Sequence, residues 1–128
     1  VQAEFAARLA ANPGTPDYSA LTVRLQRLWK IRRERTLPPS VFHPEPGIDS
    51  ALVLLERRAP REWPPVRAAF FDDLVRRGFS QRRKQLRPLL AADRDQWNSW
   101  CARHGLPPTV RAEDLSVALW IDLACSLD

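Results

Sequence analysis

The sequence has no methionine, only four glycines and only two cysteines among its 128 residues. The glycines, at positions 14, 47, 78 and 105, are isolated from one another, so the chain contains no glycine-rich phosphate-binding loop. Cys101 and Cys125 form no CxxC pair, which leaves a zinc site without its usual ligand spacing. We expect both cysteines to be small, partly buried apolar side chains in a reducing compartment.

Other absences exclude whole classes of protein. No apolar run approaches the roughly 18 residues of a membrane-spanning helix, and the first residues, VQAEFAARLAA, lack the basic and apolar regions of a signal peptide. His43 and His104 lie far apart and share no ligand spacing. No Ser–His–Asp or Cys–His arrangement has a recognisable spacing either. We therefore expect a cytoplasmic protein with neither a membrane nor a metal as its partner.

Positive charge is plentiful and unevenly distributed along the chain. The net charge is +5. The window from Arg57 to Arg87 holds ten Lys or Arg against three acids, or +7, whereas the rest of the chain holds ten against twelve, or −2. Such a concentration is typical of a surface that binds a polyanion. An arginine-rich composition inherited from a GC-rich genome explains the total equally well, and charge alone does not separate these interpretations.

The first part of the chain predicts two helices and two strands. A short helix is expected over 4–11 and a second over 18–29, where leucines recur at helical spacing and Asp17 can act as the N-cap. The charged run near 29–36 predicts an exposed strand, and the apolar run near 50–57 predicts a buried one. Two strands alone make a poor core. Because the chain also begins without Met, we expect it to be part of a longer protein whose sheet these strands join.

The second part of the chain predicts helices only. The proline-rich link APREWPP is the expected boundary between one part over 1–58 and another over 59–128. The fold class expected from this pattern is α+β and mostly helical: two strands with flanking helices, followed by a small helical domain. Helices are predicted over 66–78, 80–91, 93–104 and 115–127, the last with Ser116 as its N-cap.

Four motifs, in order along nearly the whole chain, resemble one family. They are VQAEFAARLAANPGTPDYSALTV, LPPSVFHPEPGIDSALVLL, FSQRRKQLRPLL and VRAEDLSVALWIDLACSL. Together they resemble the KsgA-type ribosomal RNA small-subunit adenine dimethyltransferases, which are relatives of the Erm methyltransferases of macrolide resistance. In that family a Rossmann-like methyltransferase domain precedes a small helical domain. The resemblance implies that this chain corresponds to the C-terminal half, with its two strands antiparallel and completing the methyltransferase sheet.

The resemblance implies a reaction and a partner for the parent protein. The parent is expected to transfer two methyl groups from S-adenosylmethionine to each of two adjacent adenines in small-subunit rRNA. The family's cofactor loop and catalytic tetrapeptide match positions upstream of Val1, so neither catalytic nor cofactor-binding residues are expected in this chain. Its expected role is to grip the RNA of an immature small ribosomal subunit. The alternatives are an Erm-type enzyme that acts on large-subunit rRNA, and a non-catalytic RNA- or ribosome-binding module.

The cations of SQRRKQLR are the main candidate RNA-binding residues. If 80–91 is a helix, Arg83 and Arg87 share one face with Lys84 beside them. Such a face suits the closely spaced phosphates of folded RNA. The alternative is a solvated helix face. By the resemblance, RNA contact is expected for Arg82, Arg83, Lys84, Arg87 and Arg111.

Two features qualify that expectation. Arg87 can equally pair with a carboxylate such as Glu113. Pro88 stands where the family usually has Asn, and a proline lacks an N–H and clashes with the carbonyl four residues earlier. The helix over 80–91 must therefore kink or begin late.

Aromatic residues supply the last candidates. Phe42 lies in a proline-rich loop between the two predicted strands. In the family this loop faces the catalytic pocket, so the resemblance implies that Phe42 stacks on the flipped target adenine. The alternative is a phenylalanine that anchors the loop to the core. The five tryptophans are expected to be packing residues: Trp29, Trp63, Trp97, Trp100 and Trp120.

Overall fold

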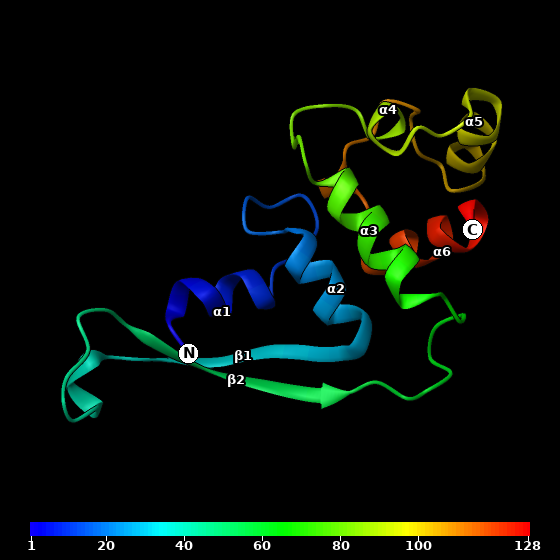
Figure 1. The fold of residues 1–128 in the computed structure, drawn as a ribbon. Helices are drawn as coiled ribbons and strands as arrows, with labels where there is room; N and C mark the ends of the chain where they lie inside the picture. The colour runs from blue at the N-terminus through cyan, green and yellow to red at the C-terminus, as the bar shows by residue number, and fades with distance from the viewer.

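The computed structural model describes all residues from 1 to 128. The first half consists of two helices that lead into an antiparallel hairpin, whose loop contains one 3-10 turn (Figure 1). The strands predicted near 29–36 and 50–57 are confirmed. The elements are α1 (Ala3–Leu9), α2 (Ala20–Leu28), β1 (Trp29–Leu37), η1 (Pro39–Val41) and β2 (Ser50–Arg57).

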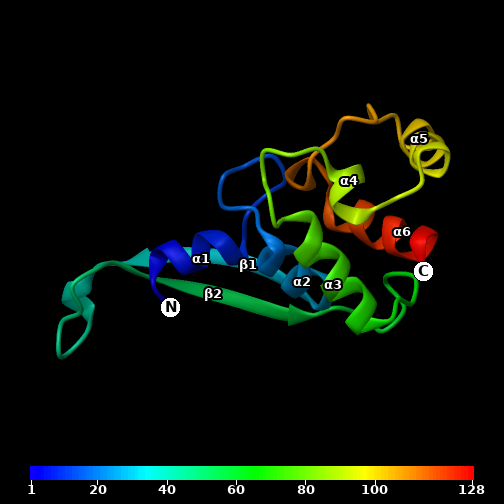
Figure 2. The ribbon, with the colours of Figure 1, turned by 45° about the horizontal axis from the view of Figure 1, so that its top comes forward.

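The second half is helical, which confirms the α+β, mostly helical class. Its helices gather beside α2, away from the loop of the hairpin (Figures 1 and 2). None of the helices is long and apolar enough to span a membrane. The elements are α3 (Ala68–Gly78), α4 (Leu86–Leu90), α5 (Arg94–Arg103), η2 (Ala112–Asp114) and α6 (Val117–Leu127).

The hairpin forms a sheet of two strands. β1 and β2 pair antiparallel along their whole lengths, with a shift of register between Arg33 and Arg35. On the other edge of β2, Gln2 forms an isolated antiparallel bridge with Ser50. Figures 1 and 2 show α1 and α2 on one face of this sheet and no element on the other.

The expectation that β2 is a buried strand is wrong. Only Ala51 is buried in it, while Leu52, Leu54 and Leu55 have exposed fractions of 43%, 45% and 54%. Alternate residues of a strand face opposite sides of its sheet, so Leu52 and Leu54 lie on the face that no helix covers. The apolar composition of the strand was read correctly, but nothing in the described structure packs on that face.

The start of α2 also differs from the prediction. Its N-cap is Ser19 rather than Asp17, which lies three residues before the first helical residue. The Ser19 hydroxyl accepts a hydrogen bond from the Thr22 N–H at 3.4 Å, and the Thr22 hydroxyl oxygen accepts one from the Ser19 N–H at 3.1 Å. Thr22 also donates its hydroxyl proton to the Arg8 carbonyl at 2.6 Å. This reciprocal capping box therefore fixes both the start of α2 and its position against α1.

The core lies among α3, α4, α5 and α6 and extends into the first part of the chain. Trp97, Trp100 and Trp120 are fully buried there, which confirms them as packing residues, whereas Trp29 and Trp63 are half-buried. The core also takes in Tyr18 and Val23, so both proposed parts of the chain contribute to it. The boundary between residues 58 and 59 stays a prediction.

The end of α3 shows why a glycine is needed at position 78. A Cβ atom there would lie 2.5 Å from Cη2 of Trp120 and 2.8 Å from Cδ1 of Leu86. Both side chains are buried and cannot move away easily. The close approach brings the end of α3 against α6 and positions the turn that follows.

Candidate nucleic-acid interface

Three of the five predicted RNA-binding cations lie in the turn between α3 and α4. The predicted helix over 80–91 begins only at Leu86, so Arg82, Arg83 and Lys84 are not helical, and the prediction of a shared helix face with Arg87 is wrong. The late start is one of the two outcomes expected from Pro88, which occupies the third helical position. A missing N–H costs little there, because the first four N–H groups of a helix have no partner within it.

The turn is anchored at its first residue. The Phe79 ring lies 5.9 Å from the Tyr18 ring and 5.7 Å from the Trp120 ring, measured between centroids. After it, the Ser80 hydroxyl donates to the Arg77 carbonyl at 2.6 Å. We call residues 80–84 the cationic turn. An aromatic anchor beneath this segment keeps its short run of charges in one place on the surface.

The 107–116 segment lies beside the cationic turn and brings Arg111 to it. The Leu86 N–H donates to the Val110 carbonyl at 2.9 Å, and Arg82 pairs with Glu113 at 3.3 Å. Arg111 lies between these two contacts in the sequence and is exposed. The fold therefore places Arg111 near the cationic turn, and its contact with RNA stays a prediction.

Arg82 differs from its two neighbours. Besides the ion pair with Glu113, it donates to the Thr15 carbonyl at 3.4 Å and lies 5.9 Å from the centroid of the Phe79 ring. Arg83 and Lys84 are exposed and form no ion pair or side-chain hydrogen bond. Arg83 and Lys84 are consequently the cations of this turn whose donors remain available to an anion.

Arg87 does not pair with Glu113, because the Glu113 carboxylate forms its ion pair with Arg82. One Arg87 N–H donates to the Ala92 carbonyl at 3.3 Å, and Arg87 also lines a hollow between α4 and α5 that includes Arg94. The sequence interpretation missed Arg94, because it follows the predicted helix and lies outside the +7 window. No local pattern could have paired it with Arg87, because the two residues lie on different helices.

Some cations of the +7 window form ion pairs within the protein, and the others form none. Arg76 and Arg77 both form ion pairs with Asp73. The hydrogen bond from Arg76, together with the charges of both arginines and the hydrogen bond from Arg77, holds the pKa of the Asp73 carboxyl below its ordinary value. Arg58, Arg67 and Arg82 also have carboxylate partners. The cations of the window without an ion pair are Arg57, Arg61, Arg83, Lys84 and Arg87, of which the last three lie in or next to the cationic turn.

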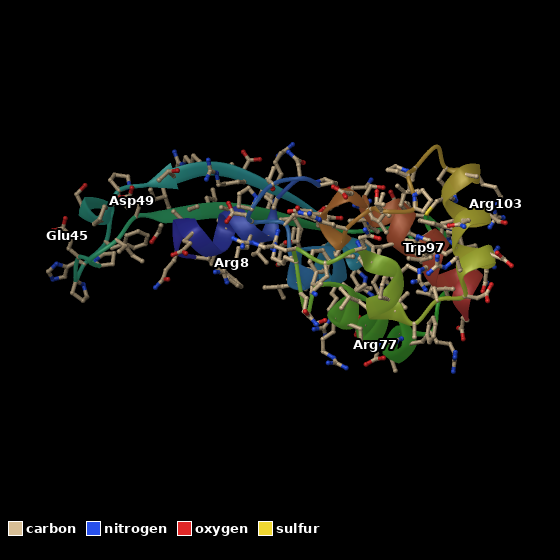
Figure 3. The ribbon with its side chains drawn as sticks, turned by 90° about the horizontal axis from the view of Figure 1, so that it is seen from above. Arg8, Glu45, Asp49, Arg77, Trp97 and Arg103 are labelled. Atoms are coloured by element: carbon tan, nitrogen blue, oxygen red, sulfur yellow. The ribbon has the colours of Figure 1, made fainter.

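Phe42 lies apart from these cations. It follows η1 in the loop that joins β1 to β2, and 40% of its surface is exposed, so it does not anchor the loop to the core. Figure 3 shows Glu45 and Asp49 of this loop at one end of the molecule and Arg77 and Arg103 toward the other. The structure therefore does not bring the predicted adenine-stacking residue and the cationic turn together.

The remaining reactive side chains form no catalytic centre. Cys101 is buried, whereas Cys125 is exposed, so the expectation that both cysteines are partly buried is wrong for Cys125. Burial raises the pKa of the Cys101 thiol, and partial desolvation together with the charges of Asp122 and Asp128 raises that of Cys125. A raised thiol pKa works against a nucleophilic role, since the thiolate is the reactive form. His104 pairs with Asp122 at 3.0 Å, and no group of three His, Cys, Asp or Glu side chains comes together.

The whole chain matches one protein family. The match is to the family described as ribosomal RNA adenine dimethylase and covers residues 1–128. The ribosomal RNA small subunit methyltransferase A of Synechococcus elongatus is 39% identical over 131 residues, which cover 99% of this chain and 46% of that protein. The protein of the same name from Paraburkholderia xenovorans is 40% identical over 124 residues, covering 97% and 44%. The chain thus spans about half the length of the curated relatives it matches.

Solved structures share its fold. A dimethyladenosine transferase from Plasmodium falciparum superimposes with a TM-score of 0.70 and 23% identity, over 95% of this chain and 53% of that one. The 23S rRNA methyltransferase ErmE superimposes with the same score and identity, over 99% and 52%. At this level of identity the likeness concerns the fold alone: the hairpin and its helices occur as about half of larger methyltransferase chains.

Proposed function

This chain belongs to the ribosomal RNA adenine dimethylase family, and from that premise we propose that it is the RNA-gripping part of an adenine dimethyltransferase. The parent protein would use S-adenosylmethionine to methylate small-subunit rRNA in the cytoplasm. Residues 1–58 would complete its Rossmann-like sheet, and residues 59–128 would form the helical domain that holds the RNA. The named relatives that act on the small subunit, at about 40% identity, favour that substrate over large-subunit rRNA.

The observation that supports this proposal most is that the cationic turn holds exposed cations without ion pairs. Arg83 and Lys84 are exposed and unpaired, Arg111 lies close by, and Phe79 anchors the turn to the core. Arg82 is held by Glu113 and would be less available to the RNA than Arg83 and Lys84. Exposed cations on a fixed backbone suit RNA phosphates, which are recognised through shape and charge rather than sequence.

The exposed Phe42 would serve a second contact. Because the hairpin loop that holds it lies at one end of the molecule, away from the helical half with the cationic turn, one RNA would have to extend along the chain to reach both. An aromatic ring at that distance can stack on an adenine taken out of its helix while the cations hold the flanking backbone. The exposed position fits this role better than anchoring the loop.

The proposal is tested by removing the two free cations of the turn. The double substitution Arg83→Ala with Lys84→Ala should weaken binding to small-subunit rRNA. It should also flatten the dependence of log affinity on log salt by about one to two units, since each phosphate contact contributes roughly 0.7–0.9. The measurement is filter binding at several salt concentrations.

The matched control removes two other exposed, unpaired cations, Arg61→Ala with Arg103→Ala. This variant loses the same charge but leaves the cationic turn intact, so its salt slope should change less. Equal slopes in the two double variants would show that only net charge matters. An unchanged slope in the first variant would reduce the cationic turn to a solvated surface.

A further inference from the structure

A polar hollow of about 290 Å³ lies between α4 and α5, next to the cationic turn. Two of its lining side chains are positively charged, two are carboxamides, and none is acidic. Trp97 and Pro108 are joined across it, because the Trp97 indole N–H donates to the Pro108 carbonyl at 2.9 Å. The lining residues are Gln85, Arg87, Arg94, Trp97, Asn98 and Pro108.

The polar side chains of this hollow have few partners within the protein. Gln85 is the N-cap residue of α4, yet its side chain makes no capping hydrogen bond. Arg94 and Asn98 take part in no ion pair or side-chain hydrogen bond, and Arg87 uses a single N–H on the Ala92 carbonyl. Asp93 forms no ion pair with Arg94; its carboxylate accepts the Gln96 N–H at 3.0 Å as the cap of α5. Several hydrogen-bond donors and acceptors that do not stabilise the fold thus line the same hollow.

The hollow is next to the surface proposed to hold RNA. A second hollow is lined by Lys84, Gln85 and Pro88, together with Gln81 and Leu89. Gln85 lines both. Gln85 thus lies between the two hollows, with Lys84 in one and Arg87 and Arg94 in the other.

We propose that the hollow between α4 and α5 holds a single nucleotide of the bound RNA and reads its base. Arg87 and Arg94 would bind the phosphate, because guanidinium groups bind phosphate oxygens through paired N–H donors. Gln85 and Asn98 would meet the base edge, because a carboxamide offers both a donor and an acceptor. This inference rests on the proposed function and adds sequence preference to a surface that otherwise contacts the backbone.

The size of the hollow is compatible with one nucleotide. Its volume lies just below the range of about 300–1,000 Å³ typical of small-molecule sites. Its lining is mostly polar and carries two positive charges, which disfavours an apolar ligand. Single unstacked nucleotides are also the usual targets of sequence-specific RNA recognition.

Two substitutions separate the phosphate role from the base role. Arg94→Ala should weaken binding of small-subunit rRNA and reduce the salt slope by about one unit. Asn98→Ala removes no charge, so its salt slope should stay unchanged. It should instead change the relative affinities for four RNA decamers, each of one base, by at least about fivefold, the lower limit for a base-specific contact.

Arg103→Ala is the control for Arg94→Ala. Arg103 is exposed, unpaired and on the same helix, but nine residues from Arg94 correspond to two and a half turns, which places it on the opposite side of α5. Circular dichroism and thermal unfolding should show the same fold in all three variants, because every substituted side chain is exposed.

The outcomes separate this inference from the proposed function. The hollow is not a nucleotide site if Arg94→Ala binds rRNA like Arg103→Ala, or if the decamers bind equally to the unsubstituted chain. It is also not one if Asn98→Ala leaves their relative affinities unchanged. In each case, a loss of binding in the Arg83→Ala, Lys84→Ala variant would leave the proposed function standing. Absence of rRNA binding by the unsubstituted chain would contradict both.

Discussion

Tyr18 ties the first part of the chain to the helical core through one buried hydrogen bond. Its ring is fully buried, and its hydroxyl donates to the Leu115 carbonyl at 2.6 Å, across 97 positions of the sequence. Burial raises the pKa of this hydroxyl well above its ordinary value, because the charged phenolate would lose its hydration. The residue therefore stabilises the fold only in its neutral form.

We expect Tyr18→Phe to lower the free energy of unfolding by about 1–3 kcal/mol, because the buried Leu115 carbonyl would lose its partner. Urea denaturation at neutral pH measures this loss. The contribution of the Tyr18 hydroxyl to the free energy of unfolding also depends on pH. It is complete below about pH 10 and declines above it, because the unfolded chain loses the hydroxyl proton at a lower pH than the folded chain does. The variant should lack this part of the alkaline decline. Equal stability of the two proteins would contradict the role of the hydrogen bond.

Glu113 limits the positive charge of the cationic turn. Its carboxylate lies 3.3 Å from the Arg82 guanidinium, and both side chains are partly exposed. We expect Glu113→Gln to tighten rRNA binding and to steepen the salt slope by up to about one unit, because an acid is removed and Arg82 is freed. The cost in stability should stay below about 1 kcal/mol, as for other partly exposed pairs.

Glu56→Gln is the matched comparison for that experiment, since Glu56 is an exposed acid on β2 without an ion pair. It should change rRNA binding much less. If Glu113→Gln binds rRNA no more tightly than Glu56→Gln does, Arg82 and Glu113 lie outside the RNA surface.

Among the elements, the short helix α4 ends in a backbone conformation that is unfavourable for the residue found there. Ala91 follows the helix with φ 52° and ψ 35°, in the left-handed region. This conformation costs an alanine about 1–2 kcal/mol, and glycine is the usual residue there. Ala91 keeps the conformation because its N–H bonds to the Arg87 and Pro88 carbonyls close the last turn.

We expect Ala91→Gly to raise the free energy of unfolding by about 0.5–1 kcal/mol, after allowing for the greater freedom of glycine in the unfolded chain. Thermal or urea unfolding measures the change. Ala102→Gly in α5 supplies a control of opposite sign: Ala102 is exposed and helical, so glycine there should destabilise by a similar amount. A loss of stability at both positions would argue against left-handed strain at Ala91.

At the scale of the whole molecule, the uncovered face of the hairpin is the main apolar surface. Leu52 and Leu54 lie on it, with exposed fractions of 43% and 45%. In the proposed parent protein the two strands would sit within a larger sheet. In this chain the outer edge of β2 is bonded only near its start, by hydrogen bonds between Val1 and Ala51 and by the isolated bridge of Gln2 with Ser50, so most of that edge is unpaired.

We expect the chain to associate into dimers or larger species at high concentration, because an unpaired apolar strand invites pairing with another chain. Sedimentation velocity over a range of concentrations measures this. Leu54→Lys should reduce the association, whereas Ile48→Lys, which changes an exposed apolar residue of the hairpin loop, should have little effect. A monomer at all concentrations would contradict the prediction.

The sequence alone was enough to determine the features that depend on neighbours along the chain. Strand composition placed β1 and β2, and helical spacing found the long helices α3, α5 and α6, with Ser116 as the N-cap of α6. The four motifs led to the family that the comparisons show. Each of these signals is local: periodicity, capping and motif spacing are properties of consecutive residues.

Which of these residues are free to act depends on contacts between distant parts of the folded chain. Arg82 and Glu113 are 31 positions apart, so no local pattern could show that Arg82 is engaged while Arg83 and Lys84 are not. The exposure of β2 depends on which face the helices cover, and the hollow between α4 and α5 requires two helices to meet. Ion pairs, burial and cavities arise from distances in space, and those distances are set only when the chain has folded.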